Sequence, residues 1–219
     1  MIDTLARIIG DVLAAEGGPI VVAIDGPSGA GKSTIARAVA AVLGATVVAT
    51  DDFFAAELTR AEWDRRSASE RARDAVDWAR LRRCALEPLR AGQQAAWHPF
   101  DFAAGERADG SYGIASHVEQ RAAAPVILIE GAYSSRPELA DLIELTVLVD
   151  APEDVRRARL KAREAAPFLA AWHERWDAAE AHYFQRVRPV ESFDVVIDSV
   201  SGEIRQRRRQ EWRPLLSGD

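Results

Sequence analysis

A glycine-rich segment between two apolar segments of different pattern constrains the fold of this chain most. Residues 19–25, PIVVAID, are a β-branched apolar run typical of a buried strand. Residues 33–44, STIARAVAAVLG, have the apolar spacing of a helix that ends at a glycine. Between them, Gly26 to Ser33 follow the pattern Gly-x-x-x-x-Gly-Lys-Ser, which binds phosphate when it connects a strand to a helix. The segment predicts an α/β fold that holds a nucleotide, but it leaves the reaction open.

The residue types of this loop each have a use in phosphate binding. The glycines let the backbone turn tightly, so that its N–H groups point at phosphate oxygens. The helix that follows adds its positive N-terminal dipole. Lys32 would neutralise the β- and γ-phosphates, and the Ser33 hydroxyl would ligate Mg²⁺. We therefore expect a nucleotide to contact Gly26, Ser28, Gly29, Ala30, Gly31, Lys32, Ser33 and Thr34.

Four further apolar runs resemble buried strands, at residues 45–50, 126–130, 145–150 and 194–198. Their continuous hydrophobicity predicts a parallel sheet with helices on both faces. The helical patterns between them cover residues 2–15, 75–91, 152–165 and 168–187. We predict a single domain over residues 1–219, in which about 75 residues separate the second and third runs. That is far more than one crossover needs, so an insertion at about 53–124 is expected to bind the second substrate.

Composition excludes several classes of protein. The net charge is −6, which argues against nucleic acid as the main partner, because a phosphate backbone demands a basic surface. Cys84 is the only cysteine, so an intrachain disulfide and a cysteine-rich metal site are excluded. No apolar run approaches the roughly 18 residues that span a membrane, and the first residues lack the basic start of a secretory signal. We expect a cytoplasmic protein without a membrane partner, and leave open whether it forms a homo-oligomer.

Carboxylates follow two of the predicted strands. Asp51 and Asp52 come after residues 45–50, and Glu130 ends residues 126–130. Because ligands bind at the carboxyl ends of parallel strands, we expect these acids near the phosphate-binding loop. A carboxylate there can take a proton from an attacking hydroxyl or hold magnesium through water, whereas an aspartate can also simply cap a helix. We predict that Asp51 is catalytic and that Asp52 and Glu130 lie at the metal, with capping left open for Asp52.

The segment WHPFDF at residues 97–102 brings a histidine, two phenylalanines and an aspartate together. Such a group can stack on a flat ring and hydrogen-bond a sugar, although buried aromatics in an ordinary turn would give the same pattern. With the catalytic aspartate, the residues predicted to contact the second substrate are Asp51, Phe54, His98, Phe100 and Asp101.

Three arginines in residues 155–164, VRRARLKARE, share one helix face. Arg156, Arg159 and Arg163 follow one another at spacings of three and four. A face of this kind can close over the charge that develops on a transferred phosphoryl group. The alternative is a plain surface helix.

The segments GPSGAGKST, TDDFF, HPFDF, LIEG and VDAPEDVRRARLKARE, in this order, resemble the uridine kinase and nucleoside kinase-like branch of P-loop kinases. Nicotinamide riboside kinases belong to the same branch, and the resemblance extends from about Ile20 to Asp198. It implies a five-stranded parallel sheet, a helical lid at about residues 156–175, and ATP with Mg²⁺ as the phosphoryl donor. By this resemblance, Asp51 is the catalytic carboxylate and Glu130 the acid associated with magnesium. Arg159 and Arg163 are the lid arginines, and Phe100 is the aromatic that contacts the sugar and base.

These features predict an ATP-dependent kinase that phosphorylates a hydroxyl of a small molecule, namely a nucleoside or ribosyl compound. A vitamin, sugar or natural product is the alternative acceptor. Uridine kinases have Ser and Tyr at the positions of Asp52 and Phe54, and a base-reading His shortly after the Asp-Phe pair, where this chain has Ala103-Ala104-Gly105. A nucleotide-dependent switch or ATPase is less favoured, because the chain has no Asn-Lys-x-Asp or Thr-Lys-x-Asp guanine-reading motif.

Overall fold

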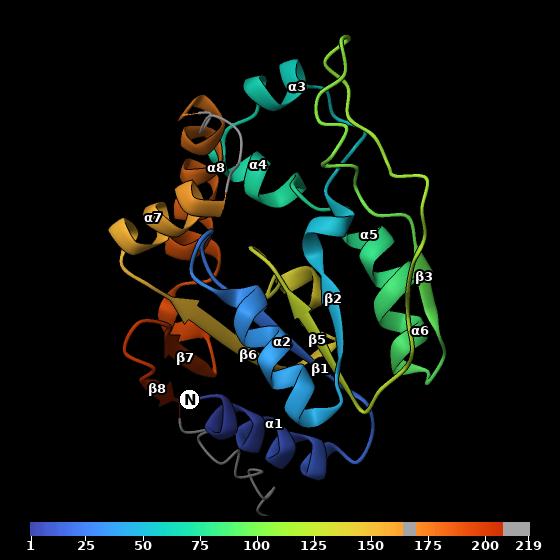
Figure 1. Ribbon diagram of the computed structural model, residues 1–219, viewed down its shortest axis with the longest axis vertical. Helices are drawn as coiled ribbons and strands as arrows, with labels where there is room; N and C mark the ends of the chain where they lie inside the picture. Colours follow the sequence, from blue (N-terminus) through green and yellow to red (C-terminus); the bar gives the residue numbers. More distant parts are fainter. Residues whose placement is uncertain (164–169, 208–219) are drawn as a thin grey trace, which may run out of the picture.

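A central sheet lies between two layers of helices in the computed structural model, which describes residues 1–163 and 170–207 (Figure 1). The strand order is β2-β5-β1-β6-β7-β8. The first five strands in this order run parallel, and β8 pairs antiparallel with β7. The bounds of these strands are Ile20–Asp25 (β1), Thr46–Ala49 (β2), Val126–Glu130 (β5), Ile143–Asp150 (β6), Val195–Asp198 (β7) and Ile204–Gln206 (β8).

The five parallel strands coincide with the five apolar runs of the sequence, so the predicted α/β class and parallel sheet are confirmed. All six residues of β1 are buried. This follows from its place in the middle of the sheet, where both faces are covered. The sequence does not predict β8, because its three residues, Ile-Arg-Gln, form no apolar run. This short strand lies at the edge of the sheet, and two of its residues are exposed.

The apolar core is divided between the two faces of the sheet. In β1, Val21 and Ala23 belong to one core and Val22 and Ile24 to the other, as expected for side chains that alternate across a strand. The core around Val22 is covered by α1 (Ile2–Glu16) and α2 (Lys32–Leu43). The core around Val21 is covered by α4 (Ala68–Asp74), α5 (Trp78–Leu81), α6 (Glu87–Arg90) and α8 (Ala170–His182).

The long segment between β2 and β5 forms a compact insertion. It contains α3 (Arg60–Arg65), α4, α5 and α6, together with the two-stranded sheet of β3 (Ala95–Trp97) and β4 (Glu119–Arg121). The helix predicted at 75–91 is shorter, because it starts at α5, and it passes through a π-helical turn before α6. Sequence explains the starts of α3 and α4: Thr59 with Glu62, and Ser67 with Glu70, each form a capping box.

The segment expected to act as a lid, at about residues 156–175, includes most of α7 (Glu153–Arg163) and the start of α8. α7 follows β6, and α8 leads into a π-helical turn before β7. They correspond to the helices predicted at 152–165 and 168–187. Residues 164–169 of the expected lid lie outside the described residues, so the lid stays a prediction. Within residues 1–163 and 170–207, no helix combines the length and the apolar character needed to cross a membrane.

Gly26, where β1 passes into the loop, is the position at which we expect a side chain to be least tolerated. Its φ of 146° is rarely adopted by L-residues, and a Cβ there would lie 2.1 Å from the carbonyl oxygen of Val149 in β6. Gly26→Ala should therefore lower the free energy of unfolding, measured in urea, by about 3 kcal/mol.

Gly10→Ala is the matched control for this substitution. Gly10 lies inside α1, and a Cβ there would meet no atom within 4 Å. Alanine should stabilise the helix by up to about 1 kcal/mol. Equal effects of the two substitutions would contradict the close approach of β1 and β6.

Candidate active site

The loop between β1 and α2 folds around the side chain of Lys32. Its ammonium Nζ donates hydrogen bonds to the carbonyl oxygens of Gly26 at 2.8 Å and Pro27 at 3.1 Å. An ammonium has three donors, so one remains for an anion after these two contacts. The first N–H groups of α2 have no partner within the helix, and the helix dipole adds positive charge there. The loop thus has the donors that a phosphate would need, and phosphate binding there stays a prediction.

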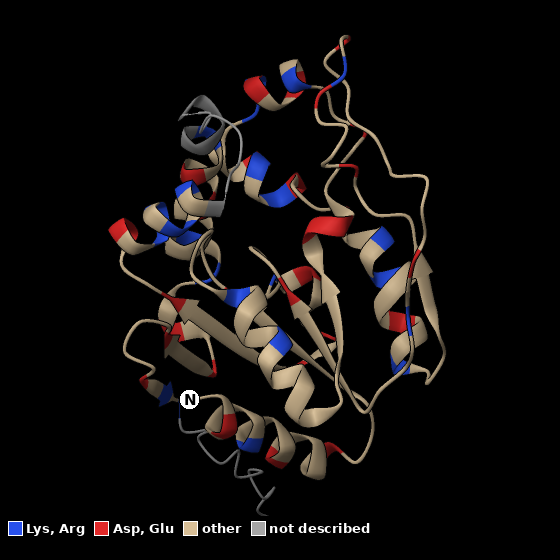
Figure 2. Ribbon diagram, in the orientation of Figure 1, with Lys and Arg blue, Asp and Glu red and all other residues tan. Residues whose placement is uncertain are grey.

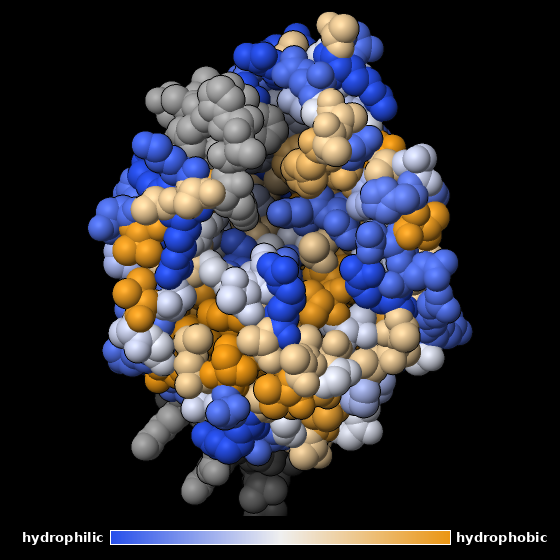
Figure 3. Space-filling model, in the orientation of Figure 1, coloured by the Kyte–Doolittle hydropathy of each residue, from blue (hydrophilic) through white to orange (hydrophobic). Residues whose placement is uncertain are grey.

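A hollow opens beside this loop. It has a volume of about 290 Å³ and is lined by Gly29, Gly31, Lys32, Ser33, Thr34, Arg37, Arg159 and Leu160. The surface in Figure 3 is hollowed between α7 and the insertion, and hydrophilic residues line much of this hollow. Most of the residues predicted to contact the nucleotide therefore face one cavity.

The hydroxyl and the carboxylate predicted to hold magnesium lie together. Ser33 Oγ donates to Glu130 Oε2 over 3.0 Å. Ala49 of β2 pairs with Glu130 of β5, so Asp51, two residues after Ala49, follows at the same end of the sheet as Glu130. Burial, followed by the charge of Asp51, raises the pKa of Glu130. Figure 2 shows acidic residues at these strand ends, facing basic residues on α2 and α7.

This set of oxygens fits Mg²⁺, which is usually held by one or two protein groups together with phosphate oxygens and water. Among residues 1–163 and 170–207, no cluster of three His, Cys, Asp or Glu side chains forms a cage for another metal. Ser33 and Glu130 are the protein groups that would hold Mg²⁺, and phosphate oxygens of a nucleotide would complete its coordination shell.

The two consecutive aspartates have different surroundings. Asp51 is exposed at the edge that carries Glu130. Asp52 is turned into the insertion, where its Oδ2 accepts a hydrogen bond from Trp97 Nε1 at 2.9 Å. Burial raises the pKa of Asp52, and its carbonyl oxygen accepts from Phe100 N at 2.8 Å and from Arg80 at 3.1 Å. Asp52 thus fastens the insertion to the end of β2, and its predicted contact with metal stays a prediction.

Of the residues predicted to bind the second substrate, the structure brings two phenylalanines together. The rings of Phe54 and Phe100 meet edge to face at 5.0 Å. His98 and Asp101 instead make local contacts: His98 Nδ1 lies 3.0 Å from the carbonyl oxygen of Ala115, and Asp101 Oδ1 accepts from the backbone N–H of Ala104. Phe100 is only 6% exposed, because further aromatic rings surround it.

Two of the three predicted arginines contact the phosphate-binding loop. Arg156 donates to the carbonyl oxygen of Ser28 at 3.3 Å. Arg159 donates to the carbonyl oxygens of Gly29 and Ala30 at 3.2 and 3.0 Å, and to Ser199 Oγ at 3.0 Å. The side chain of Arg163, the third, lies outside the described residues. α7 is therefore tied to the loop through the first two arginines.

Asp25, which sequence reasoning did not single out, is a fully buried carboxylate at the end of β1. Its Oδ1 accepts from the backbone N–H groups of Gly26 at 2.7 Å and Tyr133 at 2.9 Å. Its Oδ2 accepts from the backbone N–H of Ser135 at 2.9 Å and from the hydroxyl of Tyr183 at 2.8 Å. Burial raises the pKa of Asp25, and the hydrogen bonds from Ser135, Tyr183 and Gly26, with the charge of Lys32, oppose the shift. The carboxylate joins the loop, the segment after β5 and the end of α8.

A signal for Asp25 was present in the sequence. An acid that ends a buried strand rarely serves packing, since an unpaired buried charge is costly. That argument selected Glu130 at the end of β5, and it applies equally to Asp25 at the end of β1.

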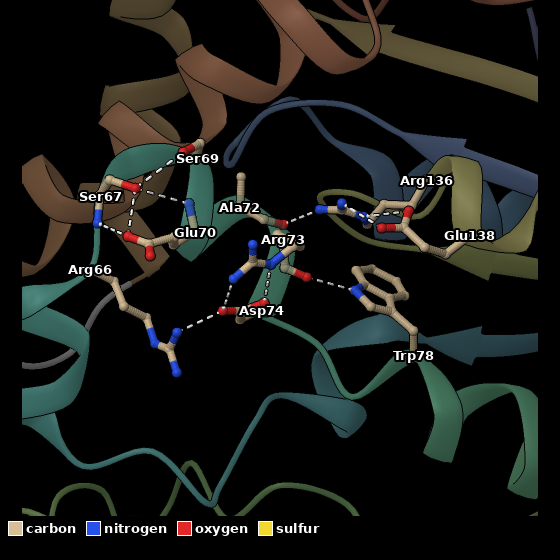
Figure 4. Close-up of polar contacts among 10 residues, drawn as sticks. All are labelled: Arg66, Ser67, Ser69, Glu70, Ala72, Arg73, Asp74, Trp78, Arg136 and Glu138. Carbon is tan, nitrogen blue, oxygen red and sulfur yellow. Dashed lines mark hydrogen bonds and ion pairs between the residues drawn. The ribbon is translucent and has the colours of Figure 1, made fainter.

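Charged side chains also fix α4 to the segment after β5 (Figure 4). Arg136 is 5% exposed; it donates to the carbonyl oxygen of Ala72 and forms a two-pronged ion pair with Glu138 at 2.8 and 2.9 Å. Asp74, at the end of α4, accepts from Arg66 at 2.7 Å and from Arg73. The bond from Arg136 to Ala72 thus joins α4 to the segment after β5, whereas the contacts of Asp74 lie within the insertion.

The strand, glycine-rich loop and helix at the centre of the sheet are those of a P-loop domain. A family model described as an AAA domain matches residues 21–186, and the chain belongs to this family. No curated protein sequence matches the chain.

Solved structures have the same fold at low identity. A protein described as a possible uridine kinase from Bacillus stearothermophilus is 22% identical, with a TM-score of 0.65 over 90% of this chain and 97% of the other. A D-glycerate 3-kinase from Cryptococcus neoformans var. grubii is 14% identical, with a TM-score of 0.63 over 94% of this chain and 99% of the other.

Asp25→Asn should destabilise the protein. An asparagine keeps one acceptor oxygen, but its amide nitrogen would face a backbone N–H, such as that of Ser135, and leave it unpaired. We expect the free energy of unfolding in urea to fall by about 2 kcal/mol.

Tyr183→Phe is the milder comparison, since it removes one of the four donors and leaves the carboxylate in place. It should cost about 1 kcal/mol. Asp25→Asn with the stability of the unsubstituted protein would show that this carboxylate does not hold the three segments together.

Proposed function

We propose that this chain is an ATP-dependent kinase that transfers the γ-phosphoryl group to a hydroxyl of a nucleoside or another ribosyl compound. The observation that carries the proposal is the position of Asp51: an exposed residue just after β2, whose last residue, Ala49, pairs with Glu130, and Glu130 in turn accepts from Ser33. A loop that only held a nucleotide would not need an exposed acid there. A kinase does, because the acceptor hydroxyl must be oriented and must lose its proton.

The roles of the residues follow from this geometry. Ser33 and, through water, Glu130 would hold Mg²⁺, which when bound neutralises charge on the β- and γ-phosphates. Asp51 receives or orients the proton of the acceptor hydroxyl. Lys32, already held at the centre of the loop by two carbonyls, stabilises the charge on the transferred group. Arg159 and Arg163 are proposed to add positive charge from the lid side.

The insertion is proposed to bind the acceptor. Phe54 follows the turn that carries Asp51, and its ring contacts Phe100 edge to face, so two aromatic side chains meet where the insertion begins. A flat base or ring could pack on such side chains. His98 and Asp101 lie in the same part of the insertion and would supply polar contacts.

A non-nucleoside acceptor, such as a vitamin, sugar or natural product, is the second candidate. The observation that favours it is the crowding around Phe54, whose ring contacts Trp63 at 5.6 Å and Trp176 at 5.2 Å. Side chains thus occupy much of the surface on which a base would stack. The two structural relatives support neither acceptor over the other.

A panel of acceptors tests the proposal and the role of Asp51. ADP release should rise strongly when one compound is supplied from a set of nucleosides, nicotinamide riboside, pantothenate and sugars. Asp51→Asn should lower this stimulated rate by about 10²- to 10⁴-fold, because the proton acceptor is lost, while the KM for ATP stays nearly unchanged. Asp109→Asn, in a turn of the insertion, is the matched control and should leave the rate unchanged. Full stimulated activity in Asp51→Asn would show that another group is the base.

Magnesium dependence tests Glu130. Glu130→Gln removes the charge beside Ser33, so at fixed ATP the Mg²⁺ concentration for half-maximal ADP release should rise by about tenfold or more. Glu203→Gln, an exposed acid in the turn before β8, should not change it. An unchanged Mg²⁺ requirement in Glu130→Gln would remove this residue from the proposed metal site.

A further inference from the structure

Glu180, on α8, is a buried carboxylate that contacts the phosphate-binding loop directly. The residue is 6% exposed. Its two oxygens accept hydrogen bonds from the backbone N–H of Ser28, at 3.1 and 3.0 Å, and one of them also accepts from the Ser28 hydroxyl. Ser28 is the third residue of the glycine-rich loop, and neither the sequence motif nor the proposed reaction uses Glu180.

A buried carboxylate is unexpected beside a loop that is predicted to bind the negative charge of a phosphate. Burial raises the pKa of this carboxyl group, and Lys32, Ser28 and Arg156 oppose the shift. Burying a carboxylate is costly unless it is well paired. The hydrogen bonds that stabilise the buried carboxylate come from Ser28 of the loop. Moving the loop away would therefore leave the carboxylate buried and unpaired.

α8 presents further side chains on the same face as Glu180. Tyr183, three residues later in the π-helical turn that continues α8, donates its hydroxyl to Asp25 at the end of β1. Trp176, four residues earlier, packs edge to face against Phe54 and Trp63 of the insertion. A helix with contacts at these spacings joins the acceptor side and the donor side of the site as one rigid element.

α7 supports the loop from the other direction. A Cβ at Gly29 would lie 2.5 Å from the carbonyl oxygen of Arg156, so the two backbones touch. Arg156 also donates to the carbonyl oxygen of Ser28. The peptide groups on both sides of Ser28 are therefore fixed, the N–H by Glu180 and the carbonyl by Arg156.

We propose that Glu180 is a positioning residue of the nucleotide site. By holding the N–H and the hydroxyl of Ser28, it fixes the orientation of the loop, so that the N–H groups of the following residues face the phosphates. The inference rests on the proposed function only in that the loop binds a nucleotide through its phosphates.

Equilibrium binding of MgADP and of adenosine separates this role from a merely structural one. Glu180→Gln should weaken MgADP binding, measured by calorimetry, by about tenfold or more, because one hydrogen bond to a charged group is lost and an amide N–H₂ faces a donor. Adenosine, which has no phosphate, should bind both proteins equally in a competition measurement. In basal ADP release without an acceptor, the KM for ATP should rise more than kcat falls.

Asp177→Asn is the matched control: it removes the same charge from α8, three residues before Glu180, where the carboxylate pairs with Arg157 instead of the loop. It should leave MgADP binding unchanged. If Glu180→Gln does not fold, Ser28→Ala tests the same contact from the loop side and should weaken MgADP by about threefold to tenfold.

MgADP binding by folded Glu180→Gln as tight as that of the unsubstituted protein would overturn the proposal, as would an equal loss of adenosine binding. Failure of the proposed function gives a different result. In that case the unsubstituted protein itself would not bind MgADP, or would bind it and transfer no phosphoryl group, whatever residue 180 is.

Discussion

The buried carboxylate of Asp25 is the interaction on which the site depends. It ends the central strand and receives donors from the loop, from the segment after β5 and from the end of α8. A buried carboxylate cannot bind water, so it must accept hydrogen bonds from protein groups. Moving any of the three segments would leave an oxygen of Asp25 unpaired and destabilise the fold. In the proposed site, Lys32 follows the loop that Asp25 holds, and Glu130 ends β5, just before the segment that Asp25 holds.

In the proposed reaction, the two substrates bind to different parts of the chain, and α8 contacts both parts. The donor side consists of the loop and α2, which the sheet supports from below. The acceptor side consists of the insertion, which Asp52 ties to β2 through Trp97 and which the contacts of Arg136 tie to the segment after β5. Trp176 and Glu180 lie on one helix and reach both sides. In this account, the nucleotide and the acceptor bind to surfaces whose relative position is set by side-chain contacts outside the loop motif.

Sequence predicted the sheet because its strands are continuous apolar runs, and it predicted the loop because glycine, lysine and serine types are chemically irreplaceable there. β8 escaped prediction, since a short polar edge strand has no pattern of its own. The local sequence also could not show that Asp52 turns toward Trp97 while Asp51 stays exposed. Glu180 was invisible for the same reason: it resembles any helix acid until the fold buries it against Ser28.

The most direct test of the central claim follows the γ-phosphoryl group itself. ATP labelled with ³²P at the γ-position is incubated with the protein, Mg²⁺ and each compound of the acceptor panel, and the products are separated by chromatography. Phosphoryl transfer to a small molecule predicts that, with one compound, the label moves from ATP into that compound. Label that appears only as inorganic phosphate with every compound, while ATP is consumed, would contradict the kinase and indicate a nucleotide hydrolase.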